Sequence, residues 1–339
     1  MSTVLVTGAA GDLGRRVVAL LSALPRIDRV VAVDLARMEA TNPVVETHVF
    51  DLSSDGSQDE LAGLGKQADS MVHLAWQPEG RDNLRALKNV LDAADAVEPA
   101  HFVHLSSATV YGAWADNPVP ITEEAQPRPN AELAYAVEKR RAEEMVGRWA
   151  EDHPQVAVGV LRPACTVGSA SHPLYQALAY TKRRPMGADG RMVQYLHVDD
   201  LAKAVVHVLE EGLSGVYNVA SDAGILEGTA GRLIGGPASF LFPRSGTMPG
   251  SPRWRSLYRG ALDGAGAYLD HSWVVSGDKL SQTGWRAEYS SEQALVVADK
   301  RGHWDDLPQG RRVALVLSGT AAVLGAVGAA GAIWWRRRA

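Results

Sequence analysis

A tyrosine and a lysine, Tyr135 and Lys139, stand four residues apart in a segment rich in alanine and glutamate. Residues at this spacing share one face of an α-helix, so the ammonium can sit near the phenol and lower its pKa toward neutrality. Such a tyrosine can act as a general acid/base for a substrate hydroxyl while a hydride moves to or from a nicotinamide. An exposed pair without a role would have the same spacing, so other motifs must decide.

Three glycines, Gly8, Gly11 and Gly14, follow the apolar run at residues 4–6. At a turn from a strand into a helix, this spacing lets backbone N–H groups meet a pyrophosphate. Asp34 lies 20 residues after Gly14, at the end of a second predicted strand, where a carboxylate can hydrogen-bond an adenosine ribose and repel a 2′-phosphate. The carboxylate therefore favours NAD over NADP. The alternative is a glycine turn in an α/β fold that binds no cofactor. Three basic residues could soften the preference: Arg15, Arg16 and Arg37.

Further motifs follow in a fixed order along the chain. They are TGAAGDLG at 7–14, DL at 51–52, HLAW at 73–76, Asn83 opening a helix, SSATVYG at 106–112, YAVEK at 135–139, LRP at 161–163, YLHVDDLA at 195–202 and YNVA at 217–220. In this order and approximate spacing they resemble the extended short-chain dehydrogenase family, also called the NAD-dependent epimerase/dehydratase family.

The resemblance implies an enzyme that uses NAD, with NADP the second choice, and that needs no metal ligand. It assigns Ser107 a hydrogen bond to the substrate oxygen and Lys139 a contact with the nicotinamide ribose, beside Tyr135 as acid/base. Family members often dimerise through helices that include the one carrying this tyrosine, which leaves a homodimer open. The cofactor-binding residues that follow from the motifs are Gly8, Ala10, Gly11, Asp12, Leu13, Gly14, Asp34, Asp51, Leu52, Leu74, Ala75, Tyr135 and Lys139.

Short apolar runs alternate with helical stretches in the order that a parallel sheet requires. Strands are predicted at 4–6, 30–33, 71–74, 102–105 and 156–161, and helices at 15–24, 83–94 and 131–150. The fold class is therefore α/β, a Rossmann doubly wound parallel sheet with a smaller C-terminal substrate lobe. We expect an NAD-binding domain over 1–165, a substrate lobe with returning Rossmann elements over 166–304, and a linker over 305–312.

Residues 313–335 form a run of 23 residues without a charge, flanked by arginines and ending in two tryptophans. This length suits a transmembrane helix, although a buried or surface-lying helix is the alternative. The N-terminus lacks the pattern of a secretory signal, so we expect a single-pass protein of the cell membrane with its catalytic domain in the cytoplasm. A net charge of −5 argues against a nucleic-acid surface, and the single cysteine excludes a disulfide within the chain and a cysteine-based zinc site.

Several polar residues have a structural explanation. His73, His104 and His197 stand in apolar runs and are predicted to be core histidines, and Arg162 is predicted to be structural. The Asp199-Asp200 pair resembles a helix start rather than a metal pair.

Two departures bear on the substrate. Family members that act on UDP-sugars usually carry an Arg-Asp pair where this chain has Val193-Gln194, and a later Arg-x-Gly-Asp element is replaced by residues 263–266. The loss of paired charge weakens a nucleotide-sugar prediction. Four arginines could supply the missing charge, although solvated surface positions explain them equally well: Arg244, Arg253, Arg255 and Arg259. The predicted function is oxidation or reduction at a secondary alcohol of a lipid-like or lipid-linked substrate; a nucleotide-sugar 4-epimerase and a non-catalytic NAD-binding regulator or membrane scaffold are the alternatives.

Overall fold

The computed structural model describes residues 2–40, 42–77, 82–168, 190–221, 224–235 and 264–304. Within these ranges, no helix is both long and apolar enough to cross a membrane. The predicted linker at 305–312, the predicted transmembrane helix at 313–335 and the four arginines between 244 and 259 lie outside the described residues.

Seven strands form one parallel sheet. Its strands are β1 (Ser2–Thr7), β2 (Ile27–Asp34), β3 (Val45–Val49), β4 (Ser70–His73), β5 (His101–Leu105), β6 (Ala157–Pro163) and β10 (Gly215–Val219). The order across the sheet is β10-β6-β5-β4-β1-β2-β3, and every neighbouring pair is parallel. The order reverses direction between β1 and β4, and ligands of such sheets bind in the crevice at that switch point.

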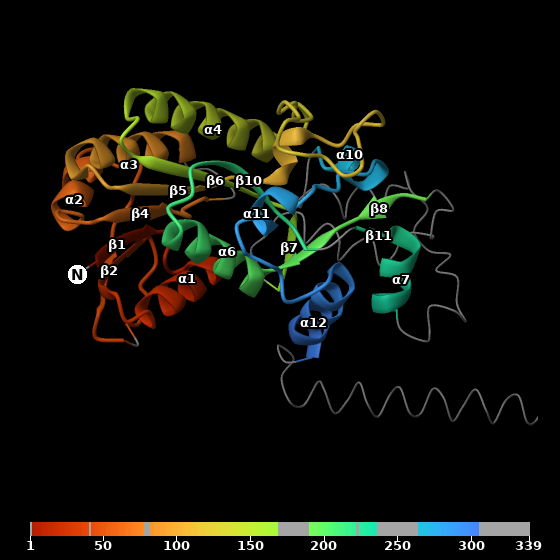
Figure 1. Cartoon of the computed structure of the whole chain (residues 1–339), viewed down its shortest axis with the longest axis horizontal. Helices are drawn as coiled ribbons and strands as arrows, with labels where there is room; N and C mark the ends of the chain where they lie inside the picture. Colours follow the sequence, from red (N-terminus) through yellow and green to blue (C-terminus); the bar gives the residue numbers. More distant parts are fainter. Residues whose placement is uncertain are drawn as a thin grey trace, which may run out of the picture.

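Helices cover both faces of the sheet, as the sequence predicts. One face carries α1 (Asp12–Ser22) and α6 (Val198–Glu210), and the other carries α2 (Ser57–Leu64), α3 (Asn83–Val97) and α4 (Ala134–Asp152) (Figure 1). Side chains alternate along β1, so Val4 and Val6 pack in the core under α1 and α6, whereas Leu5 packs in the core under α2 to α4. The doubly wound α/β prediction is therefore confirmed.

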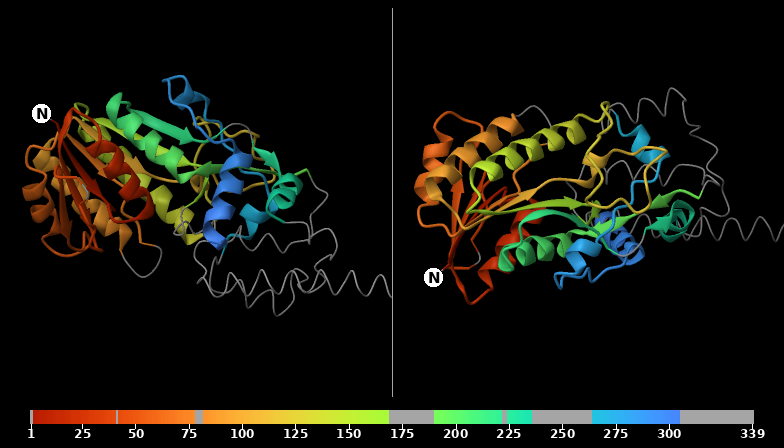
Figure 2. Two further views of the ribbon diagram at one scale, coloured as in Figure 1. Left: turned by 90° about the horizontal axis from the view of Figure 1, so that it is seen from below. Right: turned by 45° about the horizontal axis from the view of Figure 1, so that its top comes forward.

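A smaller lobe lies beyond the carboxyl ends of the strands (Figure 2). It contains the parallel pair β7 (Cys165–Val167) and β9 (Tyr195–His197), the antiparallel pair β8 (Met192–Val193) and β11 (Ile225–Leu226), and the helices α7 (Glu227–Gly235), α10 (Gly266–Asp270) and α12 (Ser291–Trp304). The short helix α11 (Asp278–Ser281) instead packs against β10 of the sheet, and the 3-10 helix η1 (Ala108–Tyr111) packs against α4 and β6. A separate core fills this lobe with Tyr195, Tyr268 and Leu295, and Tyr135 of α4 packs against it. The tyrosine thus lies where the sheet layer meets the lobe.

The two predicted domains are interleaved along the chain. The helix α6 and the strand β10 come after residue 190, yet they belong to the sheet layer, as returning Rossmann elements should. The division of the chain at residue 165 stays a prediction.

Candidate active site

The loop between β1 and α1 has a backbone that only glycine can follow. Gly8 has a φ of +76°, and a Cβ there would lie 2.5 Å from the backbone nitrogen of Ala75. A Cβ at Gly14 would lie 2.0 Å from the carbonyl oxygen of Gly8. The glycines therefore let the first turn of α1 pack closely on the loop, which leaves backbone groups rather than side chains at the start of the helix.

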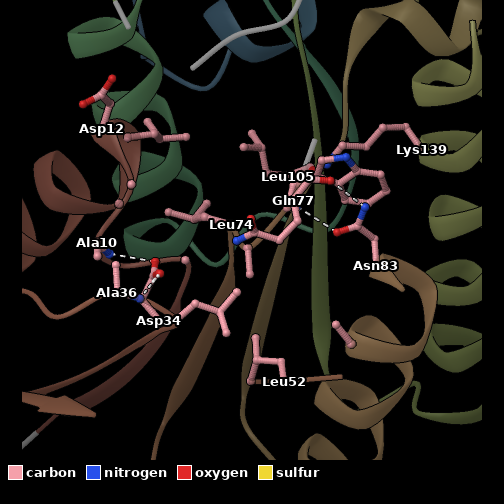
Figure 3. A pocket seen from close by; sticks show the side chains of 18 of the residues that line it. Ala10, Asp12, Asp34, Ala36, Leu52, Leu74, Gln77, Asn83, Leu105 and Lys139 are labelled. Atoms are coloured by element: carbon pink, nitrogen blue, oxygen red, sulfur yellow. Dashed lines mark hydrogen bonds between the residues drawn. The ribbon is translucent and has the colours of Figure 1, made fainter. Parts of the chain in front are cut away.

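Asp34 ends β2 and faces this loop. Its Oδ2 accepts a hydrogen bond from the backbone N–H of Ala10 at 2.9 Å, and its Oδ1 accepts one from Ala36 at 3.0 Å (Figure 3). Each carboxylate oxygen keeps further acceptor capacity, so the pair can also receive ribose hydroxyls. Arg15 bonds the carbonyl of Ala10. A 2′-phosphate on the same ribose would face the fixed negative charge of Asp34.

Arg16 is held by its own helix and by α6. Its Nε lies 2.5 Å from a carboxylate oxygen of Asp199, and its Nη1 donates to the carbonyl of Asp12 at 2.9 Å. These contacts engage two of the donors of Arg16 in structure, and the carboxylate of Asp34 still favours NAD over NADP.

A cavity of about 400 Å³ runs along the carboxyl ends of the strands at the switch point. All thirteen residues predicted to bind the cofactor line it: Gly8, Ala10, Gly11, Asp12, Leu13, Gly14, Asp34, Asp51, Leu52, Leu74, Ala75, Tyr135 and Lys139. Among these thirteen, Gly8 and Lys139 are 131 positions apart in the sequence, and the fold brings both to one cavity.

Ser107 lies beside Tyr135 and is not among the described residues that line the cavity. Only 2% of Ser107 is exposed, and its Oγ accepts hydrogen bonds from the backbone N–H and the hydroxyl of Thr109, at 3.2 and 2.9 Å. It also shares a side-chain hydrogen bond with Tyr135. The neighbour Ser106 lines the cavity in its place, so Ser107 reaches the site through the tyrosine.

Lys139 is buried on the inner face of α4, with 2% of its surface exposed. Its Nζ donates to the carbonyl oxygen of Leu105 at 2.8 Å (Figure 3). Burial lowers the pKa of this ammonium to about 7, although the charges of Glu138 and Glu143 act in the opposite direction. The lysine can therefore change its charge near neutral pH.

The expected effect of Lys139 on Tyr135 is absent from this structure. Burial raises the pKa of Tyr135 to about 12, and the hydrogen bond with Ser107 offsets only part of that rise. The Nζ of Lys139 lies 5.9 Å from the centre of the tyrosine ring. The sequence prediction of a phenol near neutrality was wrong here because the spacing on the helix cannot show how deeply each group is buried.

The three histidines have the structural positions that the sequence predicts. His73, His104 and His197 are all buried, and His73 bonds the hydroxyl of Thr7 at 2.7 Å. Burial lowers the pKa of His73 to about 3, so this residue is neutral at physiological pH. These histidines support the core under the site. The Asp199-Asp200 pair lies in the first turn of α6, as predicted. Asp200 does not cap this helix, because its carboxylate accepts hydrogen bonds from the backbone N–H groups of Glu288 and Tyr289.

Comparison with known proteins gives the family. Residues 4–220 match the family described as the NAD dependent epimerase/dehydratase family. The chain belongs to this family.

Individual relatives share less than 30% of their residues with this chain over the matched segments. The chain is 28% identical over 241 residues to GDP-6-deoxy-D-mannose reductase of Pseudomonas aeruginosa, a match that covers 64% of this chain and 73% of that protein. It is 26% identical over 262 residues to an uncharacterized protein of Mycobacterium tuberculosis, covering 68% of this chain and 65% of the relative. Thermus thermophilus UDP-glucose 4-epimerase in complex with NAD has a TM-score of 0.65 at 20% identity and covers 89% of this chain and 99% of its own. That structure shows the shared fold alone.

Two features of this family member were missed in the sequence. The side chain of Asn83 accepts from the backbone N–H of Gln77 at 2.8 Å and donates to the carbonyl of Gln77 at 2.9 Å, and so it fixes the backbone that follows β4 (Figure 3). Trp76, in the same segment, lines the cavity. Asn83 stands out in the sequence only as a helix start, and Trp76 only as part of a motif.

A buried network behind Lys139 was also missed. Arg162 of β6 forms an ion pair with Glu143 of α4 at 2.6 Å, and its Nη1 donates to the hydroxyl of Tyr111 at 2.8 Å. That hydroxyl donates to Asn218 of β10 at 2.9 Å, and Ser106 bonds Glu143. The network ties β6, β10, α4 and η1 together, which agrees with the predicted structural role of Arg162.

Proposed function

We propose that this chain is an NAD-dependent oxidoreductase that acts at a secondary alcohol carbon, with Tyr135 as general acid/base. The observation that carries the proposal is a single cavity lined by the glycine loop and Asp34 as well as by Tyr135 and Lys139. Ser107 holds the hydroxyl of Tyr135, and Lys139 contacts the ribose next to the nicotinamide.

The residues present suit a dinucleotide. The glycine loop can receive a pyrophosphate because a Cβ at Gly8 or Gly14 would collide with backbone atoms. Asp34 can receive the adenosine ribose, and its charge disfavours a 2′-phosphate, which supports NAD. When bound, NAD would accept a hydride from the substrate carbon or NADH would return one.

Tyr135 handles the proton of the substrate oxygen. With its pKa raised to about 12, the phenol keeps its proton at neutral pH and can donate it as a carbonyl is reduced. In the opposite direction the tyrosine must act as the phenolate that accepts a proton. With the Nζ of Lys139 at 5.9 Å from the tyrosine ring centre the phenol pKa is not lowered, so this direction requires the ammonium to move closer to the hydroxyl. Ser107 keeps the phenol oriented in both directions.

The replacement Tyr135→Phe tests this role. We expect it to reduce turnover by about 10²- to 10⁴-fold while the dissociation constant of NAD changes less than about threefold. Tyr217→Phe is a matched control, because that hydroxyl bonds the carbonyl of Ser214 away from the cavity. Turnover is followed as absorbance at 340 nm with alcohols and nucleotide sugars. Full activity in Tyr135→Phe would refute the assignment.

The substrate that we favour is a lipid-like or lipid-linked alcohol. Val193, at the place where UDP-sugar enzymes carry an arginine, is buried in the lobe core, and Gln194 bonds the backbone of Val275 on both sides of its amide. The nearby Arg191 forms an ion pair with Glu227. The charges and amides of this strand are therefore engaged in structure.

A nucleotide-sugar 4-epimerase is the second candidate, because the Pseudomonas aeruginosa relative is named for a GDP-linked sugar. The purified chain is denatured and tested for released NAD, and NADH is followed as candidate substrates are added. Retained NAD with no net NADH on addition of a UDP-sugar supports the epimerase. Exchangeable NAD with steady NADH formation from a lipid alcohol supports the dehydrogenase.

We also propose that residues 313–335 anchor the protein in the cell membrane, with the catalytic part in the cytoplasm. The support is the uncharged run of 23 residues between arginines. Deleting residues 313–339 should move the protein from the membrane fraction to the soluble fraction. Unchanged fractionation would contradict the anchor.

A further inference from the structure

The indole of Trp76 covers the ammonium of Lys139. The Nζ lies 3.7 Å from the ring centre, which is within cation–π distance. The same Nζ donates to the carbonyl of Leu105 at 2.8 Å, and only 2% of Lys139 is exposed. An oxygen atom needs about 2.8 Å from a nitrogen to accept a hydrogen bond, so none fits between the indole and the ammonium.

The indole also contacts the proposed acid/base. Its ring meets that of Tyr135 edge to face, with 6.0 Å between the ring centres. The backbone next to Trp76 is fixed, because Asn83 bonds both the N–H and the carbonyl of Gln77. The side chain of Trp76 is half-buried, so we expect the indole to leave Lys139 by turning about its own bonds rather than by a shift of the strand end.

Lys139 is the one cation among the described residues that line the cavity. The acidic side chains on the same lining are Asp12, Asp34, Asp51 and Asp82. A ligand rich in hydroxyl and phosphate oxygens thus has a single charged donor available from this part of the chain. Whatever covers that donor competes with the ligand for it.

We propose that Trp76 competes with the nicotinamide-side ribose for Lys139, so that the indole must turn away before a dinucleotide reaches the ammonium. This inference rests on the proposed function, in which Lys139 contacts that ribose. It makes Trp76 a residue that controls cofactor affinity at one end of the cavity only. The adenosine end, at the glycine loop and Asp34, should be indifferent to it.

Three ligands separate the two ends. ADP reaches the glycine loop but has no second ribose, ADP-ribose adds that ribose, and NAD adds the nicotinamide. Binding is measured by titration calorimetry on the full chain in mild detergent. We expect Trp76→Ala to bind ADP-ribose and NAD about three- to tenfold more tightly than the unsubstituted chain, with the affinity for ADP unchanged.

Two further variants serve as controls for this measurement. Trp76→Phe keeps a weaker aromatic contact, so its affinity for ADP-ribose and NAD should lie between those of the unsubstituted chain and Trp76→Ala. This variant also keeps the test open if Trp76→Ala folds poorly. Trp114→Phe is the matched control, because Trp114 packs under Arg128 at 5.7 Å and does not line the cavity. The chain has nine tryptophans, so the fluorescence of Trp76 is obtained as the difference between the unsubstituted chain and Trp76→Phe. That difference signal should respond to ADP-ribose and not to ADP.

The outcomes are distinct. Tightening confined to ADP-ribose and NAD supports the competition. Unchanged or weaker NAD binding in both Trp76 variants overturns it while leaving the proposed function intact. If none of the three ligands binds the unsubstituted chain, the proposed function fails and the inference fails with it.

Discussion

Two buried cations lie close to Glu143 of α4, Lys139 on the same helix and Arg162 on β6, and their surroundings differ. Arg162 lies against Glu143 at 2.6 Å, with 6% and 9% of the two side chains exposed. Lys139, one helical turn before Glu143, has a carbonyl oxygen and an indole as its close neighbours. Among the described residues, no carboxylate lies within ion-pair distance of Lys139, whose pKa burial lowers to about 7.

The pKa of Arg162 moves in the opposite direction. Burial by itself lowers the pKa of the guanidinium, but the hydrogen bonds and charge of Glu143 outweigh burial and leave the pKa raised. A carboxylate partner therefore decides whether a buried cation stays charged as part of the structure or becomes a group that can titrate. The network of Arg162 holds the strands and helices of the layer together, whereas Lys139 is a group that can titrate beside the cavity.

Breaking the paired region should have the largest effect. Glu143→Gln leaves the charge of Arg162 buried without its counter-ion, so we expect a loss of about 3 to 5 kcal/mol in the free energy of unfolding. The measurement is urea unfolding at pH 7. The control is Glu144→Gln, because Glu144 pairs with Arg140 at 2.8 Å on the exposed side of the same helix and should cost about 0.5 kcal/mol or less. Equal losses in the two variants would contradict the comparison.

Removing the unpaired cation should instead stabilise the fold. The pKa of Lys139 is lower in the folded chain than the usual 10.5, so the unfolded chain binds more protons between about pH 7 and 10.5. The penalty for the buried charge is therefore full below pH 7 and fades as the pH rises. A pKa that falls from 10.5 to about 7 corresponds to roughly 5 kcal/mol, and the lost hydrogen bond and cation–π contact offset about 2 kcal/mol of it. Lys139→Met should therefore gain about 3 kcal/mol at pH 6 and progressively less toward pH 10, while losing turnover.

Lys279 provides the matched control for that replacement. Its Nζ donates to the carbonyl of Val216 at 2.8 Å and lies 4.6 Å from the ring centre of Tyr217, so its partners are of the same kind, but the residue is exposed. Lys279→Met should change the free energy of unfolding by less than about 0.5 kcal/mol, without a trend between pH 6 and 10. A gain in Lys139→Met that did not depend on pH would count against the titration.

A smaller effect is expected at the edge of the network. Tyr111→Phe removes the hydroxyl that accepts from Arg162 and donates to Asn218. We expect a loss of about 1 to 2 kcal/mol in urea unfolding, because the guanidinium keeps Glu143 and loses one neutral partner. A loss as large as that of Glu143→Gln would show that the hydroxyl, rather than the ion pair, holds the network together.

The sheet could be predicted because its strands are buried on both faces. Such strands are apolar runs, and the predicted run at 30–33 lies inside β2, Ile27–Asp34. The edge strand β3 was missed, since three consecutive polar residues stand between the two valines of Val45–Val49 and Val49 is 54% exposed. The short helix α2 was missed as well, and a helix of 8 residues offers little periodicity to detect.

The residues of the cavity followed from motifs, but their contacts did not. Nothing in the sequence shows that Trp76 lies on Lys139, because 63 residues separate the two and the contact depends on the first turns of α4 lying beside the segment that follows β4. The burial of Tyr135 depends on the lobe core, which brings residues near it in the sequence together with residues from the far half of the chain, such as Tyr268 and Leu295. The spacing of motifs therefore identified Tyr135 and Lys139 but could not give their protonation states, which depend on burial.

The return of the chain to the sheet has a consequence for synthesis. The strand β10, Gly215–Val219, pairs with β6 only after the lobe segments before it have been made. Until then β6 is an open edge whose backbone N–H and C=O groups can pair with another chain, and the sheet face that α6 later covers is bare. A ribosome-bound chain that ends near residue 165 is thus open to aggregation, and the completion of the sheet waits for the lobe to emerge.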